Sequence, residues 1–239
     1  MARIELFSDE GFRCDGRRPH ELRKMSCRLG TFEQADGSSY VEMGNTRVLA
    51  TVYGPRETKS NRSRLLFDRA IINCEYSLAT FSTPERRRKP RGDFRSIEIT
   101  NNLKEVYESA ILTELYPYSQ IDIFLQVLQS DGSNYSACIN AATLAIINAG
   151  IPIKDIVCAC SAGIINDTPM VDLSYIEESM GSNAMLTVAL LPKEKQILSM
   201  ESSGRIHLEA MDSLVDTAIN GCMDVNNIMK GTVLNYVME

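Results

Sequence analysis

Apolar and polar residues alternate along much of the first third of the chain. The stretch SSYVEMGNTRVLATVYG at 38–54 alternates on both sides of Gly44-Asn45, a pair that is typical of a tight hairpin turn. AIINCEYSLATF at 70–81 is also rich in β-forming residues. Between them, the polar and basic segment 55–69 is expected to be an exposed loop. The pattern therefore predicts an antiparallel sheet here.

The spacing of apolar residues becomes helical further along the chain. An amphipathic helix is predicted over 96–115, where apolar residues recur every three or four positions. QIDIFLQVLQS at 120–130 predicts a strand, and a second helix is predicted over 134–149, ending at Gly150. The apolar face of the strand consists of Ile121, Ile123, Leu125 and Val127.

The second half returns to strands and ends in a helix. Strands are predicted within 155–166, 170–174, 185–192 and 196–202. A last helix is predicted over about 207–236, with Gly221 and Gly231 as points of possible interruption. This order predicts a mixed α/β fold with partly antiparallel sheets and helices packed on them.

Composition and charge narrow the class of protein. The 239 residues suffice for one large domain or two small ones, and no apolar run approaches the ~20 residues of a membrane span. The N-terminus is too charged for a signal peptide, so we expect a soluble intracellular protein with no membrane partner. Residues 1–95 hold 19 of the 25 Lys and Arg against 13 acids, whereas the rest holds 6 against 18. This asymmetry favours one face for a polyanion, unless the charges are scattered over both surfaces.

Several common kinds of site are not expected. Seven cysteines form no C-x-x-C pair, and the two histidines lie far apart, so a zinc site is not predicted. Cys158 and Cys160 are expected to share one face of a strand as small core residues. The common nucleotide-binding glycine loops and the G-x-S-x-G motif are not found in the sequence. No bound metal is predicted.

A basic loop is the clearest charged feature. Its cations are Arg86, Arg87, Arg88, Lys89, Arg91 and Arg95. This density suits contacts with the phosphates of a nucleic acid, because an arginine fork matches phosphate oxygens. The alternatives are a solvated loop and a targeting signal. Arg62 and Arg64 lie on the other basic loop, at 55–69.

A small polar loop joins the strand at 120–130 to the helix at 134–149. It reads Asp131-Gly132-Ser133-Asn134, which is typical of a turn. A strand that runs through such a loop into a helix favours an anion site, because the first helical N–H groups are free. The loop itself carries no Lys or Arg, so whether it holds phosphate stays open.

Carboxylates gather in MVDLSYIEES at 170–179. Asp172, Glu177 and Glu178 lie close together after a predicted strand. Two carboxylates near a phosphate loop are suited to hold Mg²⁺ or to move a proton. The spacing alone favours the alternative, a helix N-terminus with acids in its first turn.

Several motifs together resemble a known family. They are SDEGFRCDGRRPHELRK, ADGSSYVEMGNTRVLATVYGP, FSTPERRRKPRGD, LYPYSQIDIFLQVLQSDG and NAATLAIINAGIPIKDIVCACSAG. Nearly the whole chain resembles the RNase PH family, and in particular the ring subunits of eukaryotic RNA exosomes. The resemblance implies an RNase PH-like α+β fold, a single domain over 1–239. Its two β-α modules, like domain 2 of ribosomal protein S5, would span about 1–150 and 151–239.

The resemblance also implies partners. Family members of this kind form six-membered rings with other RNase PH-like subunits. Three RNA-binding cap subunits and separate hydrolytic exoribonucleases bind to such a ring. Single-stranded RNA threads through the pore for 3′-to-5′ processing of rRNA and turnover of mRNA, in the nucleus, nucleolus and cytoplasm. The loop with Arg62 and Arg64 matches the loop that narrows the pore, and the segment 86–95 matches an RNA-facing loop.

The resemblance finally implies a chemistry from which this chain departs. Active members use phosphate to cleave RNA, and their phosphate loop carries a Gly, then a Ser or Thr, and then an Arg. In this chain the three matching positions follow Gly132 and are Ser133, Asn134 and Tyr135, so a tyrosine stands in place of the arginine. Active members also carry an acidic Asp-x-Asp motif and a further Asp four residues on, and the matching residues here are Asp172, Ser174 and Glu178. Active archaeal rings carry paired arginines where this chain has Phe94-Arg95.

Three hypotheses follow from these departures. The leading one is a non-catalytic, RNA-guiding ring subunit without cofactors, in which Asp172 and Glu178 are remnants or support the fold. The second is an active phosphorolytic 3′-5′ exoribonuclease that needs Mg²⁺, inorganic phosphate, Arg95 and Asp172, with the missing cation supplied by a neighbouring subunit. The third is a stand-alone binding protein.

Overall fold

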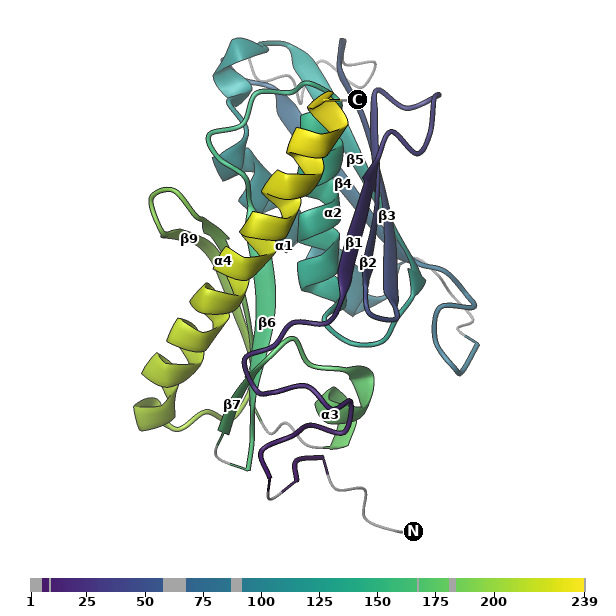
Figure 1. The fold of residues 1–239 in the computed structure, drawn as a ribbon. Coiled ribbons are helices and arrows are strands. Elements are labelled where there is room, and N and C mark those ends of the chain that lie inside the picture. Colours follow the sequence, from purple (N-terminus) through teal and green to yellow (C-terminus); the bar gives the residue numbers. More distant parts are fainter. Residues whose placement is uncertain are drawn as a thin grey trace.

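A computed structural model of the chain shows the predicted mixed α/β fold (Figure 1). It describes residues 6–8, 10–57, 68–86, 92–166, 168–180 and 184–238. Two sheets carry the strands, one formed before residue 150 and the other after it. The long helices pack against these sheets.

The first sheet has five strands in the order β1-β2-β3-β5-β4. They are β1 (Met25–Leu29), β2 (Gly37–Met43), β3 (Thr46–Glu57), β4 (Ile71–Leu78) and β5 (Ser119–Gln129). The predicted hairpin at Gly44-Asn45 is confirmed, because Met43 pairs directly with Thr46. The predicted antiparallel pairing is confirmed for β1, β2 and β3, and β3 also pairs antiparallel with β5, whereas β4 pairs parallel to β5. A helix returns the chain between these two strands, so both run in the same direction.

The second sheet has four strands in the order β7-β6-β8-β9, and each neighbouring pair is antiparallel. They are β6 (Cys158–Ile165), β7 (Thr168–Val171), β8 (Ala184–Leu191) and β9 (Gln196–Gly204). Helix α4 (Leu208–Met238) follows and continues through both Gly221 and Gly231. A Cβ at Gly221 would lie 2.8 Å from Cys160 Sγ, so this glycine lets α4 pack closely on β6.

Helix α2 (Asn134–Asn148) is central in the fold and almost entirely buried (Figure 1). It packs against β2 and β3 of the first sheet and against β6 of the second. The Asn140 side chain accepts from the N–H of Ala159 at 2.9 Å and donates to the carbonyl of the same residue at 3.0 Å. The helix therefore joins the two sheets by polar as well as apolar contacts.

Other helices depart from the predicted pattern. Helix α1 (Phe94–Ala110) ends earlier than predicted, because Ile111 is buried in an extended conformation and bridges to Ile153. A 3₁₀ turn, η2 (Thr113–Leu115), occupies the end of the predicted helix. Strand β1 and helix α3 (Tyr175–Met180) were not predicted as such. Because α3 carries its acids in the first turn, it agrees with the alternative interpretation of that acidic segment.

One large apolar core spans both sheets. The four apolar residues predicted on one face of β5 are at most 1% exposed, and Cys158 and Cys160 are completely buried as expected. Within the described part of the chain, no helix is both long and apolar enough to cross a membrane.

Candidate functional site

A cleft of about 530 Å³ lies beside the start of α2; we call it the α2 cleft. Its walls come from the segment after β4, the start of α1, the loop between β5 and α2, α3, and strands β8 and β9. The charged and polar side chains that line it include Arg86, Arg95, Ser133, Tyr135, Glu178 and Glu201. The two halves of the chain therefore meet at this cleft.

The strand, loop and helix predicted around residues 120–149 meet at the start of α2. Strand β5 ends at Gln129 and the helix begins at Asn134, with Ser133 as its N-cap. The Ser133 hydroxyl does not cap the helix; it hydrogen-bonds the hydroxyl of Ser161 and donates to the carbonyl of Leu173. The backbone N–H of Ser133 donates to Glu178 Oε1 at 2.7 Å. A carboxylate of the chain itself thus lies at the start of this helix.

The loop between β5 and α2 is packed tightly on the acidic segment. Gly132 has φ +83°, and a Cβ there would lie 2.5 Å from the carbonyl oxygen of Leu173. Only glycine allows so close an approach of the two backbones in this conformation. The N–H of Tyr175 also donates to the carbonyl of Asp131 at 3.2 Å. These contacts hold the loop between β5 and α2 against the acidic segment at 170–179.

Asp172 is completely buried and paired with Arg23. The Arg23 guanidinium donates to Asp172 Oδ2 at 2.9 Å and to Oδ1 at 2.7 Å, and it also donates to the carbonyl of Asp131 at 2.7 Å. Burial alone would raise the pKa of Asp172, but hydrogen bonds and charge from Arg23 outweigh it and lower the pKa. The pair of Asp172 and Arg23 therefore connects the N-terminal segment, the loop between β5 and α2, and the acidic segment. Asp172 does not line the α2 cleft.

A second buried pair joins Arg13 to Glu177. Arg13 Nε donates to Glu177 Oε1 at 2.8 Å, and Nη2 donates to Oε2 at 2.5 Å. Ser174 supports the pair, since its N–H and its hydroxyl donate to Glu177 Oε2 at 2.8 and 3.1 Å. Burial would raise the pKa of Glu177, but the hydrogen bonds from Arg13 and Ser174 outweigh it and lower the pKa. Ser174 thus serves the interior and does not line the cleft.

Glu178 and Tyr135 face the cleft itself. Burial raises the pKa of Glu178 by more than the Ser133 amide, Arg23 and Arg95 lower it. Burial likewise raises the pKa of the Tyr135 hydroxyl to about 12, so this hydroxyl stays neutral at physiological pH. The side chain at position 135 therefore brings no charge to the cleft.

Two family models together match most of the chain. Residues 21–152 match domain 1 of the 3′ exoribonuclease family RNase PH, and residues 155–221 match domain 2. The chain belongs to the RNase PH family. Its similar relatives include human "Exosome complex component RRP41", 51% identical over all 239 residues and 97% of that protein. An RRP41 homologue from Arabidopsis thaliana is 47% identical over 92% of this chain and 90% of that protein.

Solved structures show the same RNase PH fold. Rice (Oryza sativa) Rrp46 has a TM-score of 0.83 and 24% identity, covering 93% of this chain and all of that one. A chain of the Archaeoglobus fulgidus exosome with RNA bound to the active site has a TM-score of 0.78 and 24% identity, covering 91% and 92%. The predicted family and fold are therefore confirmed.

The structure brings only some of the predicted site residues of this RNase PH protein together. Ser133, Asn134, Tyr135 and Glu178 line the α2 cleft with Arg86 and Arg95, whose side chains are exposed. The Asn134 amide donates to the hydroxyl of Ser130 at 2.7 Å. The remaining cations predicted to bind RNA lie outside the described residues; they are Arg62, Arg64, Arg87, Arg88, Lys89 and Arg91.

Sequence reasoning missed Arg13 and Arg23, the two arginines that organise the site. Each pairs with an acid more than 140 residues away in the chain, 164 residues for Arg13 and 149 for Arg23. Both belong to a motif that carries the resemblance to the RNase PH family, which is the only sequence signal that points to them. Their partners become visible only once the chain is folded.

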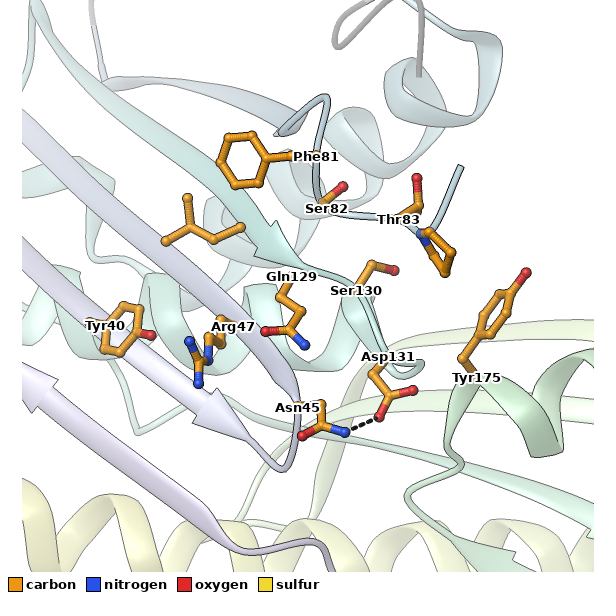
Figure 2. Close-up of a pocket in the computed structure, with 12 residues that line it drawn as sticks. Tyr40, Asn45, Arg47, Phe81, Ser82, Thr83, Gln129, Ser130, Asp131 and Tyr175 are labelled. Atoms are coloured by element: carbon orange, nitrogen blue, oxygen red, sulfur yellow. Dashed lines mark hydrogen bonds between the residues drawn. The ribbon is translucent and has the colours of Figure 1, made fainter. Parts of the chain in front are cut away.

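A second cleft of about 600 Å³ adjoins the α2 cleft, and we call it the β-face cleft (Figure 2). The two clefts share Ser130 and Tyr175, along with Thr83 and Pro84. Figure 2 shows aromatic side chains around it, with Arg47 beside Tyr40 and with Asn45 donating to Asp131 Oδ2 at 3.2 Å. The aromatic residues are Tyr40, Phe81 and Tyr175, of which Phe81 is 72% exposed.

Metal ligands do not gather in either cleft. Among the described residues, no group of three or more His, Cys, Asp or Glu side chains is arranged to hold a metal ion. Asp172 and Glu177 already face arginines, and Glu178 faces the Ser133 amide. The described acids of the 170–179 segment therefore serve contacts within the protein.

Proposed function

We propose that this RNase PH protein is a ring subunit of an RNA exosome that has no useful catalysis of its own. It binds single-stranded RNA and guides it to separate hydrolytic 3′-to-5′ exoribonucleases. The proposal is supported by the relatives named exosome complex component, which match the chain over nearly their full lengths in human, plant and yeast. The similarity spans the whole fold, which favours the same place in a ring.

The observation that carries the non-catalytic part is the neutral side chain at position 135. Phosphorolysis must bring an orthophosphate and a phosphodiester together, and both are anions. The family resemblance implies that active members carry an arginine at this position, where a cation offsets the repulsion. Tyr135 has a pKa of about 12 and offers a hydroxyl without charge. Loss of such an electrostatic group commonly lowers a rate by about 10²–10³.

The RNA-binding part rests on charge and aromatic rings. Arg86 and Arg95 are exposed at the α2 cleft and are suited to contact phosphates without regard to base sequence. The adjoining β-face cleft offers Tyr175 and Phe81, and aromatic rings of this kind stack on the bases of single strands. The proposed partners are the other five subunits of a six-membered ring, three RNA-binding cap subunits, and hydrolytic nucleases in the nucleus, nucleolus and cytoplasm. Processing of rRNA and turnover of mRNA are the proposed roles.

A phosphate-dependence assay tests the proposal. The assembled ring, prepared without hydrolytic subunits, is incubated with single-stranded RNA, Mg²⁺ and inorganic phosphate. We expect bound RNA and no nucleoside diphosphate, because the cleft lacks the cation that phosphate needs. An archaeal exosome ring that degrades RNA by phosphorolysis serves as the positive control. Release of nucleoside diphosphate that requires phosphate would contradict the proposal.

An active phosphate-dependent exoribonuclease is the second candidate function. It is favoured by the placement of Arg95 and Glu178 in one cleft at the start of α2. A neighbouring subunit would then supply the missing cation, with Mg²⁺ and inorganic phosphate as co-reactants. Activity that appears in the assembled ring and is lost in Arg95→Gln would establish this candidate over the first.

Binding of RNA to the ring is expected to weaken as salt rises. Each phosphate contact with a single strand contributes about 0.7 to the slope of log affinity against log salt concentration. Arg86→Gln and Arg95→Gln together should therefore reduce the slope by about 1.4, measured by fluorescence anisotropy between 50 and 200 mM salt. Arg28→Gln, an exposed residue of β1 outside both clefts, serves as control and should leave the slope unchanged. An equal slope in all three proteins would place the RNA elsewhere.

A further inference from the structure

The carboxylate of Glu178 lies where an anion would bind to α2. Its Oε1 accepts the backbone N–H of Ser133 at 2.7 Å, and both residues line the α2 cleft. The helix has no acidic residue in its own first turn, and its N-cap side chain makes no capping hydrogen bond. The negative charge at the start of α2 therefore comes from α3, 45 residues further along the chain.

This arrangement has a direct physical consequence for inorganic phosphate. The first N–H groups of a helix attract anions through hydrogen bonding and through the helix dipole. A carboxylate that already accepts the Ser133 N–H removes that donor from any other anion. Its charge also repels an approaching phosphate at short range, inside a cleft where water screens the repulsion only partly.

The Glu178 side chain is held in this place from several sides. Its own N–H donates to the carbonyl of Ser174, the residue before α3, and the neighbouring Glu177 is anchored to Arg13. On the other side, the N–H of Tyr175 donates to Asp131 in the loop that precedes α2. Because helix and loop are already fixed relative to each other, little ordering entropy opposes the contact between Glu178 and Ser133.

We propose that Glu178 is an internal anion that occupies the phosphate-binding amide of the α2 cleft and thereby excludes inorganic phosphate. The proposal deepens the function proposed above and rests on it. It adds a second obstacle to phosphorolysis, since the site both lacks a cation at Tyr135 and holds its own carboxylate. It also gives a role to the extra methylene that distinguishes this glutamate from the aspartate of active members.

The test measures binding of inorganic phosphate to the full-length chain by ³¹P NMR line broadening at neutral pH. Glu178→Gln removes the charge with nearly the same shape, and Glu178→Ala also vacates the amide. We expect phosphate to bind Glu178→Ala at least about tenfold more tightly than it binds the unaltered protein, the low end for a charge-assisted hydrogen bond, with Glu178→Gln in between. Glu201→Gln is the matched control, because Glu201 lines the same cleft from β9.

A second readout follows the amide directly. In the unaltered protein the Ser133 N–H is hydrogen-bonded, so its hydrogen exchange should be at least about tenfold slower than in Glu178→Ala. Glu201→Gln should leave that rate unchanged. Equal phosphate affinity and equal Ser133 exchange in the unaltered protein and Glu178→Ala would overturn the proposal. A gain in phosphate affinity as large in Glu201→Gln as in Glu178→Gln would overturn it too, since total charge alone would then govern binding.

These outcomes are separate from those of the function assay. Release of nucleoside diphosphate by the assembled ring contradicts the proposed function whatever the isolated chain binds. Failure of Glu178→Ala to gain phosphate affinity contradicts the internal-anion proposal and leaves a non-catalytic ring subunit intact, with the neutral Tyr135 and the lost carboxylate at Ser174 as the remaining obstacles.

Discussion

Replacing Arg23 with methionine is expected to lower the free energy of unfolding by about 3–5 kcal/mol. The guanidinium of Arg23 is the partner that compensates the fully buried carboxylate of Asp172, with contacts of 2.7 and 2.9 Å. Methionine fills similar space but removes both guanidinium contacts of that buried charge. The carboxylate keeps only the backbone N–H of residue 23 at 2.9 Å and Arg17, whose Nη1 lies 3.8 Å from Asp172 Oδ2. The carbonyls of Asp131 and Gly132 lose donors in the same step. Urea unfolding at neutral pH, followed by circular dichroism, measures the change.

Two variants separate the ion pair from a general effect of losing an arginine. Arg28→Met, at an exposed position of β1, should change stability by less than about 0.5 kcal/mol. Arg23→Met combined with Asp172→Asn removes the stranded charge and should be more stable than Arg23→Met alone. Asparagine is chosen because Asp172 has φ 54°, a conformation that asparagine tolerates. If Arg23→Met unfolds at the same urea concentration as the unaltered protein, the pair contributes nothing to stability.

The pH dependence of this effect has a definite sign. Arg23 lowers the pKa of Asp172 below its ordinary value of 3.8, so the pair stabilises the protein above that pH. As pH falls below 3.8 and through the folded-state pKa, Asp172 takes up a proton and the contribution is lost. The difference in stability between Arg23→Met and the unaltered protein should therefore narrow in acid. A difference that stays constant down to that range would point to lost packing of Arg23 instead.

The Arg23 pair also changes how Asp172 is understood. In active family members the matching carboxylate belongs to the acidic site, and the sequence alone leaves open whether Asp172 is a remnant or supports the fold. The side chain contacts Arg23 and lies outside the lining of the α2 cleft. A purely structural requirement is thus sufficient to keep an aspartate here. Glu178, by contrast, lies in the cleft, and its longer side chain reaches the Ser133 amide.

Local patterns predicted much of this fold because they depend on neighbours in sequence. The alternation in β5 and the turn at Gly44-Asn45 determine strands and a hairpin within a few residues. The end of α1 could not be predicted in this way, because Ile111 is extended and forms a β-bridge with Ile153, which lies far along the chain. The parallel pairing of β4 with β5 likewise depends on how the chain returns through α1.

The loop of the candidate site could be predicted from the sequence, but its two buried ion pairs could not. Turn residues and the helix after them locate Ser133 at the start of α2 from sequence alone. The sequence places Glu177 and Glu178 side by side without showing which one faces the interior. In the fold Glu177 pairs with Arg13, whereas Glu178 contacts Ser133. Only the orientation of α3 against the rest of the molecule decides between them, and that orientation is a tertiary property.

Replacing Gly132 with alanine is expected to lower the free energy of unfolding by about 2–5 kcal/mol. Two costs add: a left-handed backbone at φ +83°, and a Cβ placed 2.5 Å from the carbonyl oxygen of Leu173. The second contact is with backbone, which cannot move aside as a flexible side chain would. The loop before α2 must therefore separate from the acidic segment, which should also weaken the contact between Ser133 and Glu178. Urea unfolding measures the stability, and hydrogen exchange of the Ser133 amide measures the contact.

Gly150, just beyond the other end of α2, provides a matched control. It has a similar left-handed φ of +70°, but a Cβ there would have nothing within 4 Å. Gly150→Ala should therefore cost only the backbone strain, about 1–2 kcal/mol, and should leave Ser133 exchange unchanged. The difference between the two variants isolates the contact with Leu173. Equal costs for both would mean that the loop moves freely off Leu173, and the close packing could then no longer be what holds the Ser133 amide against Glu178.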